Sequence, residues 1–107
     1  MCGILGVISN KKNVTQIIND WIRQLQNRGY DSFGVSYFEK NNIKTIKQAS
    51  SNKKDSITVV MKQIQNETIY NIISHTRWAT HGPKNNINSH PHTSINNKFS
   101  LVHNGII

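Results

Sequence analysis

The second residue of the chain is a cysteine, and it is the only cysteine among the 107 residues. Removal of Met1 ahead of this small residue would leave Cys2 as the amino terminus. A free α-amino group has a pKa of about 7.7 to 8.0, so part of it is neutral near pH 7 and can accept the thiol proton. The thiolate is the nucleophilic form of cysteine, so Cys2 would supply both nucleophile and base. The alternative is a small, buried, apolar cysteine in a strand.

Two further segments carry side chains suited to binding. The stretch from Arg77 to Ser94 is predicted to be a loop, and a loop of this length in a small domain favours a functional role. It holds Arg77, Trp78, Thr80, His81, His90 and His92. Near the end of the chain, Asn104-Gly105 is typical of a turn.

The histidines allow a second interpretation. Neutral imidazoles bind zinc, and His75, His81, His90 and His92 could be drawn as one site. No carboxylate or cysteine stands at ligand spacing beside His90-Pro91-His92, so we predict structural hydrogen bonding and no metal. We also expect no cofactor.

The elements that would position these residues follow from hydrophobic periodicity. The run from Cys2 to Ile8 predicts a buried strand. Asn13 is placed to cap a first helix and Gly29 to end it, with an apolar stripe of Val14, Ile17, Ile18, Trp21, Ile22 and Leu25. Further expected elements are strands at Phe33–Phe38, Ile43–Lys47, Ile69–Ser74 and Phe99–His103, and a second helix from about Asp55 with Ile57, Val60, Met61 and Ile64 on one face.

Composition narrows the class of protein. The length suits one domain, a single cysteine excludes an internal disulfide, and the apolar run from Ile4 to Ile8 is far shorter than the ~20 residues of a membrane span. The 13 Lys+Arg against 5 Asp+Glu give a formal charge of +8, but no basic run reaches five residues. A solvated surface is therefore favoured over nucleic-acid binding. We expect a cytoplasmic protein without membrane association.

Five blocks of sequence together resemble the glutaminase domain of glutamine–fructose-6-phosphate aminotransferase, a class II glutamine amidotransferase. They occur in the family's order and with credible spacing, and they span the chain from end to end. They are Met1-Cys2-Gly3-Ile4, Asn27-Arg28-Gly29-Tyr30-Asp31-Ser32, Ser74-His75-Thr76-Arg77-Trp78-Ala79-Thr80-His81-Gly82, Ser89-His90-Pro91-His92 and Val102-His103-Asn104-Gly105-Ile106-Ile107.

The resemblance implies a role for each matching residue. Cys2 would attack the side-chain amide of glutamine, and Asn104 and Gly105 would form the oxyanion hole. Arg77 would bind the substrate α-carboxylate, for which a planar, bidentate donor suits better than lysine. Its alternative is a surface arginine.

The remaining roles are supporting ones. Trp78 would belong to a flap over the site, or else only to packing, and Thr80 and His81 would hydrogen-bond glutamine. Arg28 would favour the Cys2 thiolate, or else only complement a helix dipole. The segment 30–32 is expected to hold the turn after the first helix, and Phe33 departs from the small residue common in the family at that position, so the strand must repack around a ring.

The fold implied is α+β, the four-layer α/β/β/α sandwich of N-terminal-nucleophile hydrolases, with residues 2–107 supplying about its first half. The apolar ending at Gly105-Ile106-Ile107 indicates a piece of a longer domain. The family's acidic residue for the substrate α-amino group, the rest of the glutaminase domain and the isomerase region would lie beyond it. Fructose 6-phosphate is then a substrate only with that region supplied, and a homo-oligomer is compatible with the family. The alternatives are a non-catalytic remnant acting at most as an interaction protein, and a basic nucleic-acid-associated domain.

Overall fold

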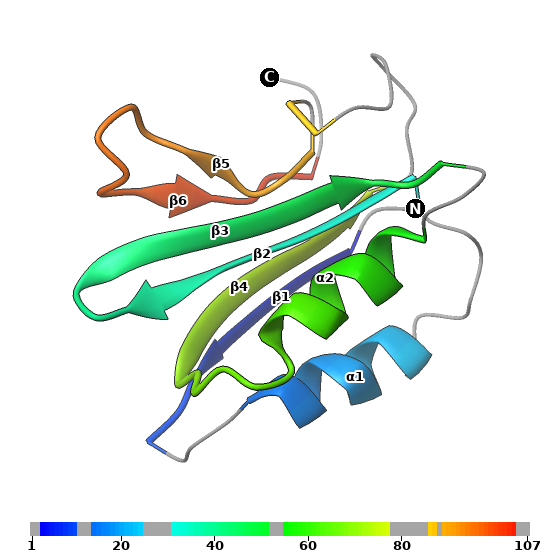
Figure 1. The fold of residues 1–107 in the computed structure, drawn as a ribbon, viewed down its shortest axis with the longest axis horizontal. Helices are drawn as coiled ribbons and strands as arrows, with labels where there is room; N and C mark the ends of the chain where they lie inside the picture. The colour runs from blue at the N-terminus through cyan, green and yellow to red at the C-terminus, as the bar shows by residue number, and fades with distance from the viewer. Residues whose placement is uncertain are drawn as a thin grey trace.

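A computed structural model describes residues 3–10, 14–24, 31–51, 55–77, 86–87 and 89–104. Its main feature is a four-stranded, fully antiparallel sheet in the order β1-β4-β2-β3 (Figure 1). The strands are β1 (Gly3–Ile8), β2 (Ser32–Glu39), β3 (Asn42–Ala49) and β4 (Asn71–Arg77). The predicted α+β class is confirmed for this part of the chain.

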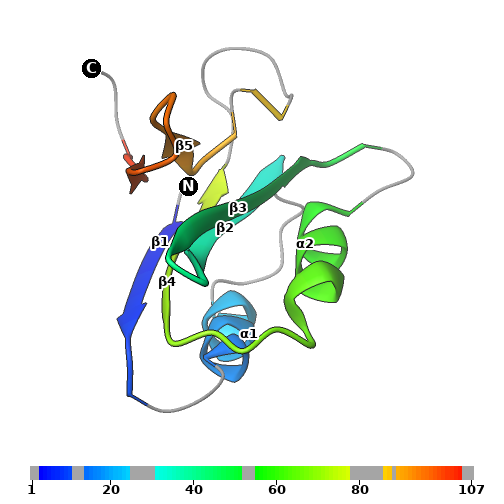
Figure 2. The same cartoon turned by 60° about the vertical axis from the view of Figure 1, so that its left-hand side comes forward.

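Two helices cover one face of this sheet, α1 (Thr15–Gln24) and α2 (Ser56–Ile64) (Figure 2). The predicted apolar stripe of α1 is confirmed at Ile18 and Ile22, which are buried, whereas Ile17 is 46% exposed. Asn13, Leu25 and Gly29 lie outside the described residues. The core between helices and sheet consists of Val14, Ile18, Ile22, Phe33, Val35, Tyr37, Val60, Ile64, Ile69 and Ile72.

The second helix begins where the sequence predicted. The side chain of Asp55 accepts a hydrogen bond from the backbone N–H of Thr58 at 3.0 Å, which satisfies one of the amide groups left open at a helix start. Val60 and Ile64 are fully buried from this helix. None of the helices among the described residues is long and apolar enough to cross a bilayer.

Phe33 lies in the core and is fully buried. The core of this protein therefore accommodates the ring at the position where the sequence departs from the family pattern. Its side chain shares the helix face of the sheet with Val35 and Tyr37, because residues two apart on a strand point the same way. The opposite face of β2 carries Gly34 and Ser36.

The predicted strands Phe33–Phe38 and Ile43–Lys47 are confirmed and form the β2–β3 hairpin. β2 extends one residue further at each end, and β3 extends one residue before and two residues after the predicted range. Lys40 and Asn41 both have positive φ, 50° and 65°. Two consecutive residues of this kind form the tight turn whose twist matches that of the flanking strands. The pairing then runs from Glu39↔Asn42 to Ser32↔Ala49.

Two sequence predictions need correction. Strand β4 begins at Asn71, not Ile69, because the carbonyls of Ile69 and Tyr70 accept the backbone N–H groups of Val14 and Ser9 instead of joining the ladder. It also extends to Arg77, which pairs with Ser32. The stretch from Arg77 to Ser94 is therefore not wholly a loop.

The second correction concerns the same stretch. It contains β5 (His92–Thr93), which pairs with β6 (Ser100–Leu101) in a separate two-stranded sheet. The predicted strand Phe99–His103 is correspondingly shorter. The Ser100 hydroxyl donates to Ser36 Oγ at 2.7 Å, and Ser36 Oγ lies 2.6 Å from Thr45 Oγ1. These bonds join the small sheet to the face of the large sheet opposite the helices.

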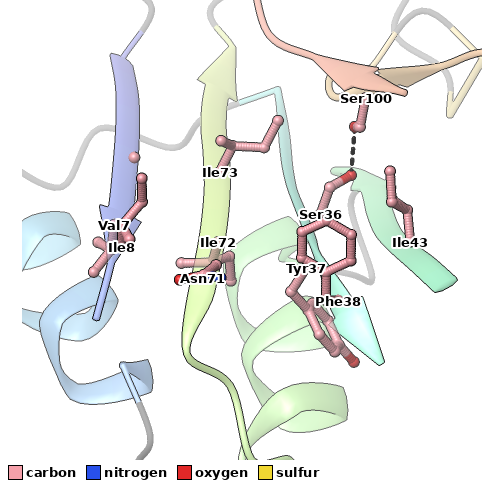
Figure 3. A pocket seen from close by; sticks show the side chains of 11 residues that line it. Val7, Ile8, Ser36, Tyr37, Phe38, Ile43, Asn71, Ile72, Ile73 and Ser100 are labelled. Atoms are coloured by element: carbon pink, nitrogen blue, oxygen red, sulfur yellow. Dashed lines mark hydrogen bonds between the residues drawn. The ribbon is translucent and has the colours of Figure 1, made fainter. Parts of the chain in front are cut away.

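That face also carries a groove of about 650 Å³ beside the small sheet. Figure 3 shows the Ser36–Ser100 hydrogen bond at one side of it, with Ile73 from β4 and Ile43 from β3 among the lining side chains. Ile8 and Phe38, which also line it, are 92% and 59% exposed. This groove lies toward the Ile8 end of β1, away from the strand end described next.

Candidate active site

The start of β1, the end of β4 and the start of β2 meet at one end of the large sheet. Gly3 pairs with Thr76, and Ser32 pairs with Arg77. The backbone N–H of Gly3 donates to Thr76 Oγ1 at 3.1 Å, and that of Asp31 donates to the Arg77 carbonyl at the same distance. The small sheet lies near this end (Figure 2).

Two of the predicted site residues are described. Arg77 is the last residue of β4 and is partly buried, and Asn104 is exposed in the segment that follows β6. The others lie outside the described residues: Cys2, Arg28, Trp78, Thr80, His81 and Gly105. In the chain, however, Cys2 directly precedes Gly3, Trp78 directly follows Arg77 and Gly105 directly follows Asn104.

Asn104 is connected to this end of the sheet by a hydrogen bond that the sequence did not reveal. Its side-chain Oδ1 lies 2.8 Å from Nε2 of His75 on β4. Since an amide oxygen only accepts, His75 Nε2–H is the donor. His75 and Arg77 are two apart on β4 and so face the same side of the sheet.

His75 is part of a row of three imidazole rings. Its ring stacks on that of His90, with centroids 4.2 Å apart and planes at 21°, and His90 in turn contacts His92 at 4.4 Å. His90 Nδ1 accepts the backbone N–H of His103 at 3.4 Å. The row thus joins β4 to both β5 and the segment that carries Asn104.

Lys47 holds the backbone on which His90 sits. Its ammonium donates to the carbonyls of Ser89 and Pro91 at 2.9 and 3.2 Å. Burial lowers the pKa of this ammonium. These two bonds tie the backbone on either side of His90 to β3.

The row is held in the neutral form at pH 7. Burial, reinforced by the nearby positive groups, lowers the pKa of His90 from 6.5 to about 4. Burial also lowers the pKa of His75, partly offset by the bond to Asn104, and that of His92. Among the described residues, no three His, Cys, Asp or Glu side chains are arranged to hold a metal ion. Neutral rings in contact act here as hydrogen-bond donors and acceptors.

We expect the protein to lose stability as the pH falls from 7 to 5. His90 of the unfolded chain takes up a proton near pH 6.5, whereas the folded protein does so only near pH 4. The unfolded state therefore binds more protons throughout this window, and the free energy of unfolding falls with pH. After allowance for the partial exposure of His90, the loss is about 1 to 2 kcal/mol. Urea unfolding at a series of pH values measures it.

The matched control for this prediction is His90→Gln, which removes the titrating group. It should reduce the slope of stability against pH in this window, leaving the smaller contributions of His75 and His92. An equal slope in both proteins would show that His90 is not the group responsible.

Asp31 secures the segment that enters β2. Besides the bond from its N–H to Arg77, its carbonyl accepts the backbone N–H of Ser50 at 2.8 Å. Its carboxylate is buried, with no hydrogen-bond partner for either oxygen among the described residues. The backbone bonds of Asp31 agree with the structural role predicted for it, whereas Tyr30 lies outside the described residues.

Comparison with known proteins gives a consistent family. A model of the class II glutamine amidotransferases matches residues 1–107. Glutamine–fructose-6-phosphate aminotransferases match over the whole of this chain, with 38% identity in Sulfurisphaera tokodaii, 43% in Caldanaerobacter subterraneus and 42% in Clostridium acetobutylicum. The chain spans 17 to 18% of the length of these relatives. Because the family model covers all 107 residues, the chain belongs to the class II glutamine amidotransferases.

Proposed function

We propose that this chain carries the glutamine-hydrolysing site of a glutamine–fructose-6-phosphate aminotransferase. The observation that carries the proposal is the convergence at one sheet end of Gly3, Arg77 and, through His75, Asn104. Each is a predicted site residue or the chain neighbour of one. Residues 2–107 are the N-terminal part of a glutaminase domain in this proposal, and the complete domain is a four-layer α/β/β/α sandwich.

Cys2 is the nucleophile in the proposed reaction. With Met1 removed, the neutral α-amino group takes the thiol proton, and sulfur attacks the side-chain carbonyl carbon of glutamine. The carbon–nitrogen bond breaks, ammonia leaves with the proton, and a γ-glutamyl thioester remains. Water then cleaves the thioester to glutamate and regenerates the thiol.

Asn104 and Gly105 stabilise the negative oxygen of the tetrahedral intermediates. The Asn104 side-chain amide and the Gly105 backbone N–H are the donors, and each such donor is worth about 3 to 4 kcal/mol in the transition state. Arg77 binds the α-carboxylate of glutamine, because a guanidinium can offer two parallel N–H groups.

The other predicted residues complete the site. Trp78 belongs to a flap that covers it, and Thr80 and His81 donate or accept hydrogen bonds with glutamine. Arg28 favours the thiolate by its charge. The ammonia would serve the formation of glucosamine 6-phosphate from fructose 6-phosphate on a separate isomerase region.

The direct test is hydrolysis of glutamine by the intact protein expressed from its own reading frame. We expect equimolar release of glutamate and ammonia, without fructose 6-phosphate being strictly required. Asparagine, one methylene shorter, is the control and should react at least about 100-fold more slowly, because its amide cannot reach the nucleophile while its α-carboxylate is bound. No hydrolysis of glutamine would favour the non-catalytic alternative.

A further inference from the structure

The hydrogen bond between His75 and Asn104 joins two segments that are 29 residues apart. His75 is 1% exposed on the central strand β4, whereas Asn104 is exposed. One partner is therefore held firmly by its surroundings, and the other lies at the surface where a substrate can meet it. The hydrogen bond therefore restrains the position of the exposed Asn104 amide relative to strand β4.

The ring of His75 has little freedom. It is stacked on His90, whose own Nδ1 is engaged by the His103 backbone and whose loop is held by Lys47. Nδ1 of His75 has no hydrogen-bond partner among the described residues. A neutral ring with its proton on Nε2 is the form that satisfies both observations, since a proton on Nδ1 would be buried without an acceptor.

This arrangement determines which way the Asn104 amide faces. With Oδ1 toward His75, the planar amide group must direct its NH₂ to the other side. Rotation by 180° would place NH₂ against Nε2–H, donor against donor, and lose the bond. An amide held in one orientation can present the same donor at every turnover, without reorganisation at the moment of reaction.

We propose that His75 is a positioning residue for the Asn104 side chain, orienting its NH₂ toward the negative oxygen that forms on the substrate. The role rests on the proposed function, since it requires Asn104 to act in the oxyanion hole. His75 itself does not touch the substrate in this proposal. Its effect is therefore on kcat, because the oxygen carries full negative charge only in the transition state and intermediate.

Two variants of His75 separate positioning from packing. His75→Phe keeps a ring that can stack on His90 but removes the donor. His75→Gln loses the ring but retains an N–H donor at similar reach. We expect His75→Phe to lower kcat for glutamine hydrolysis about 10- to 100-fold with KM changed less than about threefold, and His75→Gln to stay within about fivefold of the wild type.

A larger loss of kcat in His75→Gln than in His75→Phe would overturn the proposal. That order is expected if the ring of His75 is needed only for packing. Equal, small effects of both would also overturn it. Thermal unfolding of each variant identifies any that fail to fold. The matched control for disturbed packing is His90→Phe, which preserves a ring in the row and leaves the His75 Nε2–H donor to Asn104 in place.

A measurement on the wild-type protein keeps the proposal testable if His75→Phe does not fold. Nitrogen chemical shifts of ¹⁵N-labelled histidine distinguish a protonated from a bare ring nitrogen, and His75→Gln assigns the signal. We expect His75 to carry its proton on Nε2. A proton on Nδ1 would contradict the orientation of Asn104 on which the proposal depends.

The activity measurements distinguish failure of the proposed function from failure of the positioning role. Wild-type protein without glutaminase activity would refute the proposed function and, with it, the positioning role, even where the Nε2 proton is found. Active wild-type protein with an unaffected His75→Phe variant would refute the positioning role alone.

Discussion

Cys2→Ala is expected to abolish glutamine hydrolysis, lowering kcat by at least about 10⁴-fold. Without the thiol no γ-glutamyl thioester can form, and the remaining donors of the site can only polarise the amide toward attack by water. The measurement is release of glutamate from glutamine by purified protein, with mass spectrometry of the amino terminus to establish that Met1 has been removed. Cys2→Ser should retain the fold and a small residual rate, because a hydroxyl is a much weaker nucleophile at the same position.

A second variant separates the two functions assigned to Cys2. Insertion of a lysine between Met1 and Cys2 prevents exposure of the Cys2 amino group but keeps the thiol. If the α-amino group is the base, this protein should lose about 10²- to 10⁴-fold in rate. Full activity in the extended protein would exclude the α-amino group as the base, and full activity in Cys2→Ala would exclude the thiol as the nucleophile.

Gly34→Ala is expected to destabilise the folded protein by about 3 kcal/mol, because it inserts a methyl group where no space exists. Gly34 pairs with His75 in the sheet, and a Cβ there would clash with the carbonyl oxygen of His90 and lie 2.8 Å from Pro91 Cδ. This oxygen belongs to the backbone, so it cannot move aside as the tip of a flexible side chain could. The strand or the His90–Pro91 segment must therefore move, and the stacking of His90 on His75 is lost.

Gly6→Ala is the matched control for this prediction. Gly6 lies on β1 of the same sheet, but an added Cβ meets nothing within 4 Å, so its effect on stability should be within about 0.5 kcal/mol or slightly favourable. Hydrogen exchange of the β2 and β4 amides, together with urea unfolding, measures both variants. A Gly34→Ala protein as stable as Gly6→Ala would mean that the His90 loop does not pack against β2 as described.

The Gly34→Ala substitution is expected to affect the candidate active site as well as stability. Displacement of His90 removes the ring against which His75 is stacked, so the Asn104 amide should lose its fixed orientation as well. A Gly34→Ala protein that still folds is therefore expected to have a lower kcat, although Gly34 lies on β2, one strand away from His75. The effect would pass through the row of imidazole rings, because His90 packs against Gly34 and its ring is stacked on that of His75.

Local patterns were sufficient to predict several elements. The apolar stripe of α1 and the Asp55 cap of α2 depend on residues three or four apart, and such neighbours can be recognised directly along a chain. The β2–β3 hairpin is similarly local, because its two strands are joined by a tight turn. The buried position of Ile18 and the N-cap of α2 could be anticipated for that reason.

Long-range pairing decided what local patterns could not. Nothing around Ile69 distinguishes it from a strand residue, but its carbonyl accepts the N–H of Val14 instead of a ladder partner. Conversely, the sequence predicts a loop at Arg77, but Arg77 belongs to β4 because Ser32 lies opposite it in the sheet. The β5 strand within the supposed loop exists only because β6 pairs with it.

The features of the candidate site can likewise be separated into those set by local sequence and those set by long-range contacts. The sequence by itself determined the family, the candidate nucleophile Cys2 and the residue types available for binding, because these depend on the identity and order of residues in short blocks. Only the tertiary structure decided that Gly3 and Arg77 share one end of a sheet and that Asn104 is hydrogen-bonded to His75 near that end. The physical reason is that a contact across 29 residues depends on strand register, on the small sheet lying across the large one and on the burial of His75, none of which is encoded in the neighbours of either residue alone.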